Sequence, residues 1–529
     1  MAHITSTAIS APESQRRRSW LVNAALAMSL AHLCFVRAWF SVLNDADYGY
    51  FNRIPVNAAT LAGLALNMLL LASVFWLAAT GLGRQHRLWP KRLGILAVLA
   101  LFLIPIDFVR LNYFAISGAA MLALVRQPLV LALSAVLCLL VWRWHSLAAR
   151  GVRAILLILL PLAGLTWVRL FLIMLNLVTL RQYEGLPVLA PPLTLAKSQP
   201  RIVWLVFDEL DYRVTFAERP ANLPLPELDR LRAESLCATA ALPPSNDTLL
   251  SMPALTTGRR VVAAEPCSPQ DLRLTLADPS LTATWSSLPN VFSRAQKLGF
   301  NCAVVAWYHP YDRVFGNLLT HCTWYPFPLF ELGRGLTLAS AMANQFWSTL
   351  APLQLRRLEL QVYQHSLSDA LEVVASRQFG LSLLHLPGPH KPGIYLPHEN
   401  RFTIAHFSTV QGYFDNLALT DLTLGQLRLR MESAGTWDQS WLIVSSDHGW
   451  REAVRYDGRS DLRVPFLVKA PGHAQGMEFT ARFNTLLTPG LIMAILREDV
   501  RSLEAARDWL AKNLVDHPPS ARNPEHDHE

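Results

Sequence analysis

Apolar residues dominate the first third of the chain and form five runs, at residues 19–43, 57–82, 93–109, 119–142 and 154–180. A helix needs about 20 residues to cross about 30 Å of hydrocarbon, and most of these runs reach that length. The third run is short, and Arg126, Gln127 and Pro128 interrupt the fourth. The pattern predicts an α-helical membrane domain of five spans over residues 19–180, after a polar leader of residues 1–18.

Basic residues between the runs predict the orientation of this domain, because loops rich in Lys and Arg stay on the cytoplasmic side. The leader and the second and fourth connecting segments carry ten Lys and Arg, whereas the alternate segments carry only Arg53, Arg110 and Arg126. With the leader inside, five crossings place the chain after residue 181 outside the cytoplasm. We therefore predict a multi-pass membrane protein, with the lipid bilayer as a partner and the C-terminal domain outside the cytoplasm.

Four ionisable residues, His32, Arg37, Asp107 and Arg169, fall within or near the predicted spans. An ionisable group in hydrocarbon is costly, so such residues pair between helices, reach the interface or serve a function. We expect pairing or contact with the interface here.

The pattern changes after residues 181–199, which form a proline-rich linker. Short β-type runs recur at 202–207, 302–307, 380–385, 441–445 and 465–468, with helix-like stretches between them at 223–236, 288–298, 355–376 and 403–434. Strands that alternate with helices predict an α/β domain over residues 200–515, with a largely parallel sheet covered on both faces. Ligands of such sheets collect at the carboxyl ends of the strands.

Composition supports the division into a membrane part and a globular part. The 529 residues are 52% hydrophobic and 16% charged, with a mean hydropathy of +0.25. Soluble chains average about 25% charged residues, so a disordered chain is excluded and a purely soluble protein is disfavoured. The net charge of +8 would suit nucleic acid only if the basic residues clustered on a soluble surface, and they do not, so we predict no nucleic-acid partner. Residues 516–529 are expected to form a disordered tail.

Six cysteines divide between the two parts, with Cys34 and Cys138 in the apolar runs and the other four in the α/β domain. Four cysteines in an oxidising compartment allow three pairings. Because Cys302 and Cys322 flank one strand-and-loop unit, we expect the pairs Cys302–Cys322 and Cys237–Cys267. Buried free thiols are the alternative.

Candidate chemistry begins at two strand ends. The first strand is followed by Asp208 and Glu209, and the run 441–445 is followed shortly by Asp447 and His448. Carboxylate oxygens with one imidazole suit a divalent ion such as Mn, Zn, Mg or Ca. Either doublet alone could be a polar strand cap, but the two together predict a metal site.

Two further segments supply hydroxyls and imidazoles. Residues 245–258 hold several Ser and Thr hydroxyls in a loop that runs into a helix. Such a cluster is often only a helix cap, and a nucleophilic threonine would need a base or a metal to remove its proton. Residues 385–392 place His385, His390 and Lys391 after another strand, where they could hold an anionic substrate or protonate a leaving group.

One ordered set of short motifs covers residues 200–475: Asp208-Glu209, Thr248 with Thr257-Gly258, His390, Ser446-Asp447-His448-Gly449 and Arg463-Val464-Pro465. This set resembles the sulfatase-like branch of the alkaline phosphatase superfamily, which implies an α/β/α fold of that type. In that superfamily the nucleophile lies nine residues before the Thr-Gly pair, which selects Thr248. The resemblance also implies that Asp208, Glu209, Thr248, Asp447 and His448 hold the metal, and we predict that His390, Lys391 and Asn246 bind substrate.

Five spans before such a domain resemble the bacterial membrane phosphoethanolamine transferases and the lipoteichoic acid synthases. This resemblance implies a multi-pass protein of the bacterial inner membrane, with its catalytic domain in the periplasm or outside. Thr248 stands where classical sulfatases have a cysteine that becomes formylglycine, which disfavours sulfate-ester hydrolysis and favours a phosphothreonine intermediate. The phosphoethanolamine transferases carry a histidine shortly after Asp-His-Gly, and residues 450–463 here contain none, so we expect a single ion.

The sequence therefore predicts a membrane-anchored, metal-dependent transferase of the cell envelope. It would move a phosphoethanolamine- or phosphoglycerol-type head group from a phospholipid donor to a glycan or lipid acceptor. Two alternatives stay open: a phosphodiesterase that uses water as acceptor, and a non-catalytic envelope scaffold that keeps the fold.

Overall fold

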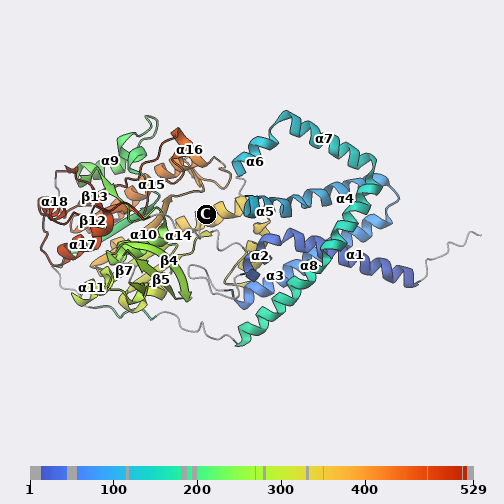
Figure 1. Ribbon diagram of the computed structural model, residues 1–529, viewed down its shortest axis with the longest axis horizontal. Coiled ribbons are helices and arrows are strands. Elements are labelled where there is room, and N and C mark those ends of the chain that lie inside the picture. Colours follow the sequence, from blue (N-terminus) through green and yellow to red (C-terminus); the bar gives the residue numbers. More distant parts are fainter. Residues whose placement is uncertain are drawn as a thin grey trace, which may run out of the picture. The chain divides into compact units, whose positions relative to one another are not determined.

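The computed structural model describes residues 13–44, 56–114, 118–179, 188–193, 199–268, 270–277, 281–328, 333–349, 351–406, 408–472, 475–514 and 516–520. These residues form two compact units, drawn in Figure 1. Unit 1 takes the described residues within Met1–Asp47, Val56–Arg181 and Leu332–Gln354. Unit 2 takes those within Gln182–Glu331 and Leu355–Glu529.

Unit 1 is helical in the part of the chain that the structure describes. Its helices are α1 (Glu13–Cys34), α2 (Val36–Asn44), α3 (Ala58–Arg84), α4 (Leu88–Leu101), α5 (Leu103–Phe114), α6 (Gly118–Val125), α7 (Pro128–Arg143), α8 (His145–Thr179) and α13 (Leu338–Ser348). The helix α13 belongs to this unit although it follows the first strands of unit 2 in the sequence.

Three stretches of helix in unit 1 are long and apolar enough to cross a membrane: Ala58–Arg84, Leu88–Arg110 and His145–Leu175. The pair Ser19–Cys34 and Val36–Leu43 passes the same test together but bends by 70° at its break, as a broken span or a re-entrant loop would. The described residues thus support three to four spans rather than the expected five.

The fourth apolar run is the one that differs from the expectation. It is divided into α6 and α7, and the longer piece, α7, has only 16 residues. The break comes at Gln127, which is extended because the proline that follows it, Pro128, disfavours the helical conformation. A span over residues 119–142 therefore stays a prediction.

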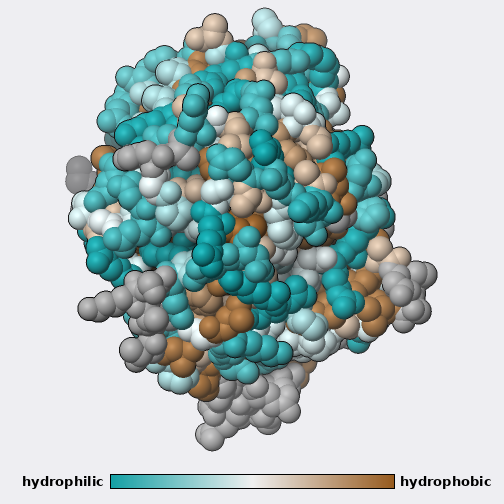
Figure 2. Space-filling model, turned by 90° about the vertical axis from the view of Figure 1, so that its left-hand side faces the viewer, coloured by the Kyte–Doolittle hydropathy of each residue, from teal (hydrophilic) through white to brown (hydrophobic). Residues whose placement is uncertain are grey.

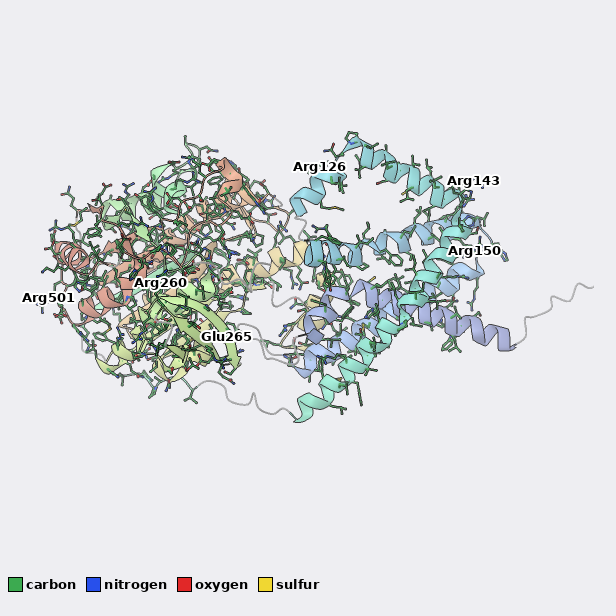
Figure 3. All side chains as sticks on the ribbon, in the orientation of Figure 1. Arg126, Arg143, Arg150, Arg260, Glu265 and Arg501 are labelled. Carbon is green, nitrogen blue, oxygen red and sulfur yellow. The ribbon has the colours of Figure 1, made fainter. Side chains whose placement is uncertain are left out.

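Ionisable groups of unit 1 pair between helices, as expected. Arg37 of α2 donates to Asp107 of α5, and Arg110 binds the other oxygen of the same carboxylate at 2.7 Å. His32 Nε2 of α1 lies 2.6 Å from Thr166 Oγ1 of α8. Figure 3 shows Arg143 and Arg150 near one end of α7 and Arg126 near its other end, so the connection predicted to be cytoplasmic carries the basic pair.

Unit 2 is built on an eight-stranded sheet with the order β14-β2-β13-β12-β1-β9-β7-β8. Its strands are β1 (Arg201–Asp208), β2 (Leu236–Ala238), β7 (Cys302–Trp307), β8 (His321–Tyr325), β9 (Leu381–Pro389), β12 (Ser440–Ser446), β13 (Phe466–Lys469) and β14 (Met477–Phe479). Only β13 among them runs antiparallel to its neighbours. Each of the five β-type runs expected from the sequence is one of these strands, which confirms a largely parallel sheet.

Helices cover both faces of this sheet (Figure 1). The described α-helices of unit 2 are α9 (Pro226–Ala233), α10 (Thr248–Thr257), α11 (Val291–Lys297), α12 (Tyr311–Phe315), α14 (Ala351–Ala375), α15 (Thr409–Ser433), α16 (Val454–Asp457), α17 (Thr488–Leu496) and α18 (Leu503–Lys512). Side chains alternate along β1, so Trp204 packs in one core cluster with α10, α11 and α17, and Leu205 packs in another with α14 and α15. This is the α/β/α arrangement that the sequence predicts.

Smaller elements complete unit 2. Three small sheets pair β10 (Tyr395–Leu396) with β11 (Arg401–Phe402), β3 (Ala241–Leu242) with β15 (Phe483–Asn484), and β4 (Val261–Ser268) with β5 (Asp271–Leu276) and β6 (Thr282–Thr284). A π-helix covers Arg213–Ala217, and 3-10 helices cover Trp285–Ser287, Gly316–Leu318, Pro397–Glu399 and Thr485–Leu487. The face of the molecule shown in Figure 2 is mostly hydrophilic, with apolar side chains in small patches.

The expected disulfides are wrong, because all six cysteines are free. Cys237 is buried in the eight-stranded sheet, whereas Cys267 is exposed on the separate sheet of β4. Cys302 and Cys322 lie on the neighbouring strands β7 and β8, but the register sets Cys322 opposite Val304. Burial raises the pKa of Cys237 to about 11 and that of Cys302 to about 12, so both are unreactive thiols.

The segment expected to be a disordered tail begins with residues that bind unit 2. Asn484 Nδ2 donates to the His517 carbonyl at 3.0 Å, and the Ser520 amide donates to the Pro244 carbonyl at 2.8 Å. Residues 521–529 of that segment lie outside the described residues, as do residues 1–12 of the leader and most of the linker.

Candidate active site

Three polar side chains gather at the carboxyl end of the central strands. Asp208 ends β1 and Asp447 directly follows β12, and these strands are parallel with Phe207 opposite Ser446. On the other side of β1, His385 of β9 lies opposite Val206. Because side chains alternate along strands, Asp208, His385 and Asp447 all point to the face that α10 covers.

Thr248 reaches this group because it is the first residue of α10. The Asp247 side chain caps the helix by accepting from the Leu249 amide, and Gly258 ends it with a φ of 71°. The Thr-Gly pair and Thr248 are therefore the two ends of one helix. Thr248 Oγ1 lies 2.7 Å from Asp447 Oδ2, 3.4 Å from Asp208 Oδ2 and 3.2 Å from His448 Nε2.

The neighbouring hydroxyls have other partners. Ser245 Oγ donates to the Ser520 carbonyl, and Ser251 Oγ donates to the Ser245 carbonyl at 3.1 Å. Thr256 and Thr257 donate to carbonyls one turn earlier in α10. Among the hydroxyls of this segment, all of which the structure describes, Thr248 is the one that contacts the carboxylates.

Backbone groups fix the orientation of Asp447 and His448. Asp447 Oδ1 accepts from the amides of His448 at 2.8 Å and Glu209 at 3.4 Å, which leaves Oδ2 for Thr248. His448 Nδ1 lies 2.9 Å from the Gly449 carbonyl, so Nδ1 carries the proton. The unprotonated Nε2 then faces the site, 3.6 Å from both Asp208 and Asp447.

Buried negative charge makes this group suitable for a cation. Asp208 and Asp447 are at most 1% exposed. Burial and the adjacent Asp447 carboxylate raise the pKa of Asp208 well above its usual range. Asp208 Oδ1 has no hydrogen-bond partner among the described residues, and ligand atoms of Asp208, His385 and Asp447 all lie within 4.8 Å of one another. Carboxylate oxygens and imidazole nitrogens at this spacing fit a divalent ion.

Glu209 points to a different partner. Its φ of 64° is rare for a residue with a Cβ, and the Tyr413 hydroxyl stabilises this turn by donating to the Glu209 carbonyl at 2.8 Å. The Glu209 carboxylate accepts from Arg451 Nε at 2.9 Å. Burial alone would raise the pKa of Glu209, but the facing positive groups lower it to about 2.

His390 lies beside this ion pair. Its Nε2 is 3.3 Å from Arg451 Nη2, and its ring packs edge-on against Trp307. Burial is the main cause that lowers the pKa of His390 to about 3, so the ring is neutral at pH 7. The neutral ring leaves Arg451 as the principal cation that keeps Glu209 ionised.

The other two predicted substrate residues are Lys391 and Asn246. Lys391 Nζ donates to Glu452 at 3.1 Å, and its side chain is 38% exposed. Asn246 is half-buried in the turn that leads into α10. Of the eight predicted site residues, the structure brings Asp208, Thr248, Asp447 and His448 into direct contact and joins Glu209 to His390 through Arg451.

Two residues of the site were not predicted, and His385 was predicted on the substrate side rather than beside the carboxylates. His385 lies inside an apolar strand, where a lone imidazole was the available signal for a ligand. His309 Nε2 lies 3.2 Å from the Thr248 carbonyl and so supports the start of α10. Arg451 follows Asp-His-Gly by two residues, and the sequence pattern did not distinguish it from the other arginines of residues 450–463.

Comparison with known proteins agrees with this type of fold. The sulfatase family model matches residues 200–488, more than half of the chain, so the chain belongs to the sulfatase family and to the sulfatase-like branch of the alkaline phosphatase superfamily. An ulvan-active sulfatase from Formosa agariphila is 30% identical over 99 residues, which are 16% of this chain and 18% of that protein. The match thus spans less than a fifth of that relative.

Two solved structures are similar to part of this chain at low sequence identity. The PsFucS1 sulfatase from Pseudoalteromonas sp. is 15% identical, with a TM-score of 0.41 over 61% of this chain and 74% of that chain. A phosphonate monoester hydrolase of Agrobacterium radiobacter is 12% identical, with a TM-score of 0.39 over 56% of this chain and 74% of that chain.

Proposed function

We propose that this protein is a membrane-anchored, metal-dependent transferase of the cell envelope that uses Thr248 as its nucleophile. One observation carries the proposal: the Thr248 hydroxyl lies 2.7 Å from Asp447 Oδ2 at the edge of a buried group of carboxylates and imidazoles. A threonine hydroxyl is a poor nucleophile without such neighbours.

The residues present fit a single divalent ion, either Mn, Zn, Mg or Ca. Asp208, His385, Asp447 and His448 would hold it, and Thr248 lies within reach of the same group. When bound, such an ion lowers the pKa of a nucleophilic hydroxyl and neutralises charge on phosphoryl oxygens. His385 is therefore added to the proposed metal ligands. Glu209 is removed from them, because its carboxylate binds Arg451.

Arg451 would supply the positive charge that a second metal ion would otherwise provide. Its guanidinium neutralises the buried Glu209 and lies beside His390, and a guanidinium binds phosphoryl oxygens in the fork geometry that arginine offers. His390 Nε2 and Lys391 would hold the other oxygens of the head group, with Asn246 beside the nucleophile. One resident arginine in place of a second ion agrees with the missing histidine in residues 450–463.

The proposed reaction has two steps. Thr248 Oγ attacks the phosphorus of a phospholipid, the bond between phosphorus and the diacylglycerol oxygen breaks, and the hydroxyl proton ends on that oxygen. A hydroxyl of a glycan or lipid acceptor then attacks the phosphothreonine, and the proton returns to Thr248. Phosphorus is favoured over sulfur because a threonine cannot form the aldehyde hydrate that sulfatases with formylglycine use.

Membership in the sulfatase family favours a second candidate, in which water replaces the acceptor and the enzyme is a phosphodiesterase. The two candidates share Thr248 and the ion and differ only in the second step.

The test uses the full chain in vesicles with phosphatidylethanolamine or phosphatidylglycerol labelled in the head group, in the presence of Mn²⁺. We expect label to appear on the protein and on Ser251→Ala but not on Thr248→Ala. Ser251 is the matched control because it lies in the same helix with its hydroxyl bound to the Ser245 carbonyl. Label released into water through this adduct would select the hydrolase. No labelled protein and no release with Mn, Zn, Mg or Ca would overturn the proposal and favour a scaffold.

A further inference from the structure

Residues 335–355 form an uncharged stretch in the middle of the unit 2 sequence. They contain no Asp, Glu, Lys or Arg, and Arg334 and Arg356 flank them. Yet the described residues of this stretch up to Gln354 belong to unit 1, and α13 is its first helix. The chain thus leaves the sulfatase-family unit and returns to it through a segment without a charge.

Helix α13 packs closely against α3, one of the helices long enough to span a membrane. A Cβ placed on Gly63 of α3 would lie 3.2 Å from the Cβ of Ala341, so the two backbones approach at small residues. Helices that associate in lipid commonly meet at Gly and Ala in this way.

Buried amide groups join the same two helices. Asn67 Nδ2 donates to Gln345 Oε1 at 2.9 Å and to the Met342 carbonyl at 3.0 Å. Gln345 Nε2 donates to the Thr60 carbonyl at 2.9 Å. Asn67 is 9% exposed and Gln345 is fully buried. Hydrogen bonds between side-chain amides and the facing helix are also typical of packing in membranes.

Large apolar side chains of α13 and of the segment just before it are exposed. Phe346 is 58% exposed and Leu338 is 42% exposed, and Leu336 just before the helix is 71% exposed. On α3, Leu69 and Leu70 are exposed in the same way beside the residues that bind α13. In water, exposed apolar side chains of this size favour aggregation, whereas lipid acyl chains would cover those of α13 and α3 alike.

The part of α3 that contacts α13 indicates how deep in the bilayer the contact would lie. The contacts run from Thr60 to Asn67, which is about 10 Å along α3 at 1.5 Å per residue. These residues form the end of α3 that the distribution of basic residues places outside the cytoplasm. At 11 residues, α13 is too short to span a membrane by itself.

We propose that residues 335–349 enter the outer leaflet of the bilayer and pack there against α3, with Leu338 and Phe346 in contact with lipid acyl chains. The inference rests on the membrane anchor of the proposed function. The sulfatase-family unit would then be attached to the membrane at two points of the chain, through this segment and through the linker.

The test measures spin-label accessibility in the full chain reconstituted into phosphatidylethanolamine and phosphatidylglycerol vesicles. Labels are placed at Phe346→Cys, at Leu70→Cys on α3 and at Leu429→Cys, a leucine that is 66% exposed on α15. The background carries Cys138→Ala and Cys267→Ser, because these are the two exposed native thiols. Collisions with oxygen report lipid, and collisions with a nickel chelate report water.

We expect the labels at positions 346 and 70 to collide more with oxygen than with nickel, and the label at 429 to show the reverse. A label at 346 that behaves like the one at 429, while the label at 70 stays in lipid, would overturn this inference and leave the membrane anchor intact. A label at 70 in water would overturn both.

Discussion

Replacing Arg451 with methionine tests whether this arginine neutralises Glu209. The Glu209 carboxyl is 3% exposed and the Arg451 side chain 19% exposed, with 2.9 Å between Nε and Oε1. Breaking a buried ion pair by removing one partner costs about 3–5 kcal/mol, because the other charge is left uncompensated. Since Arg451 retains some contact with water, we expect about 3 kcal/mol for Arg451→Met.

The loss should be visible as a change in the unfolding of the sulfatase-family unit. At about 2–4 °C for each kcal/mol, Arg451→Met should lower its Tm by about 6–12 °C. Scanning calorimetry of the full chain in detergent with a chelator measures this without a contribution from added metal. The double variant Glu209→Gln with Arg451→Met removes both charges and should recover about 2 kcal/mol of the loss.

Two results would refute the reasoning. A loss below about 1 kcal/mol for Arg451→Met would show that Glu209 does not depend on this partner. A double variant as unstable as the single one would show that the cost comes from lost packing of the long arginine side chain rather than from an unpaired carboxylate.

Three further predictions follow from other parts of the chain. Burial lowers the pKa of Lys469 to about 8, so on raising the pH the folded state releases this proton before the unfolded state does. The free energy of unfolding should therefore rise with pH above about 8. Lys469→Met should remove up to about 3 kcal/mol of that rise, measured by denaturant titrations at pH 7.5 and 10. Asp447→Asn should lower bound metal and turnover together, measured by elemental analysis, while Asp229→Asn, an exposed carboxyl of α9, should change neither; metal retained by Asp447→Asn would place the ion elsewhere. Gly63→Leu should separate α13 from α3 and speed proteolysis within residues 333–349, whereas Gly81→Leu, with nothing within 4 Å, should not; equal rates would contradict the docking.

The sequence predicted the parts of the site that local rules control. A strand followed by a carboxylate places that carboxylate at the sheet edge, so Asp208 and Asp447 were predictable once the strands were. The helix from Thr248 to Gly258 follows from its cap and its left-handed terminal glycine, which fix the nucleophile's distance from the Thr-Gly pair.

The parts that depend on three-dimensional contacts were not predictable. His385 joins the carboxylates because β9 lies beside β1 with a particular register, which the sequence does not specify. Arg451 was one of several arginines in its loop until the fold placed it on Glu209. The disulfide expectation failed for the same reason, since closeness in sequence did not put Cys302 opposite Cys322.

Mass spectrometry of the peptide that contains Thr248 tests the central claim most directly. The full chain is incubated with phosphatidylethanolamine or phosphatidylglycerol vesicles and Mn²⁺, quenched in acid and digested. The account predicts a fraction of this peptide heavier by the phosphorylated head group of the lipid supplied, with the added mass on Thr248 and absent when the ion is chelated. A peptide that stays unmodified with both lipids while turnover proceeds, or an adduct on Ser245 or Ser251 instead, would contradict it.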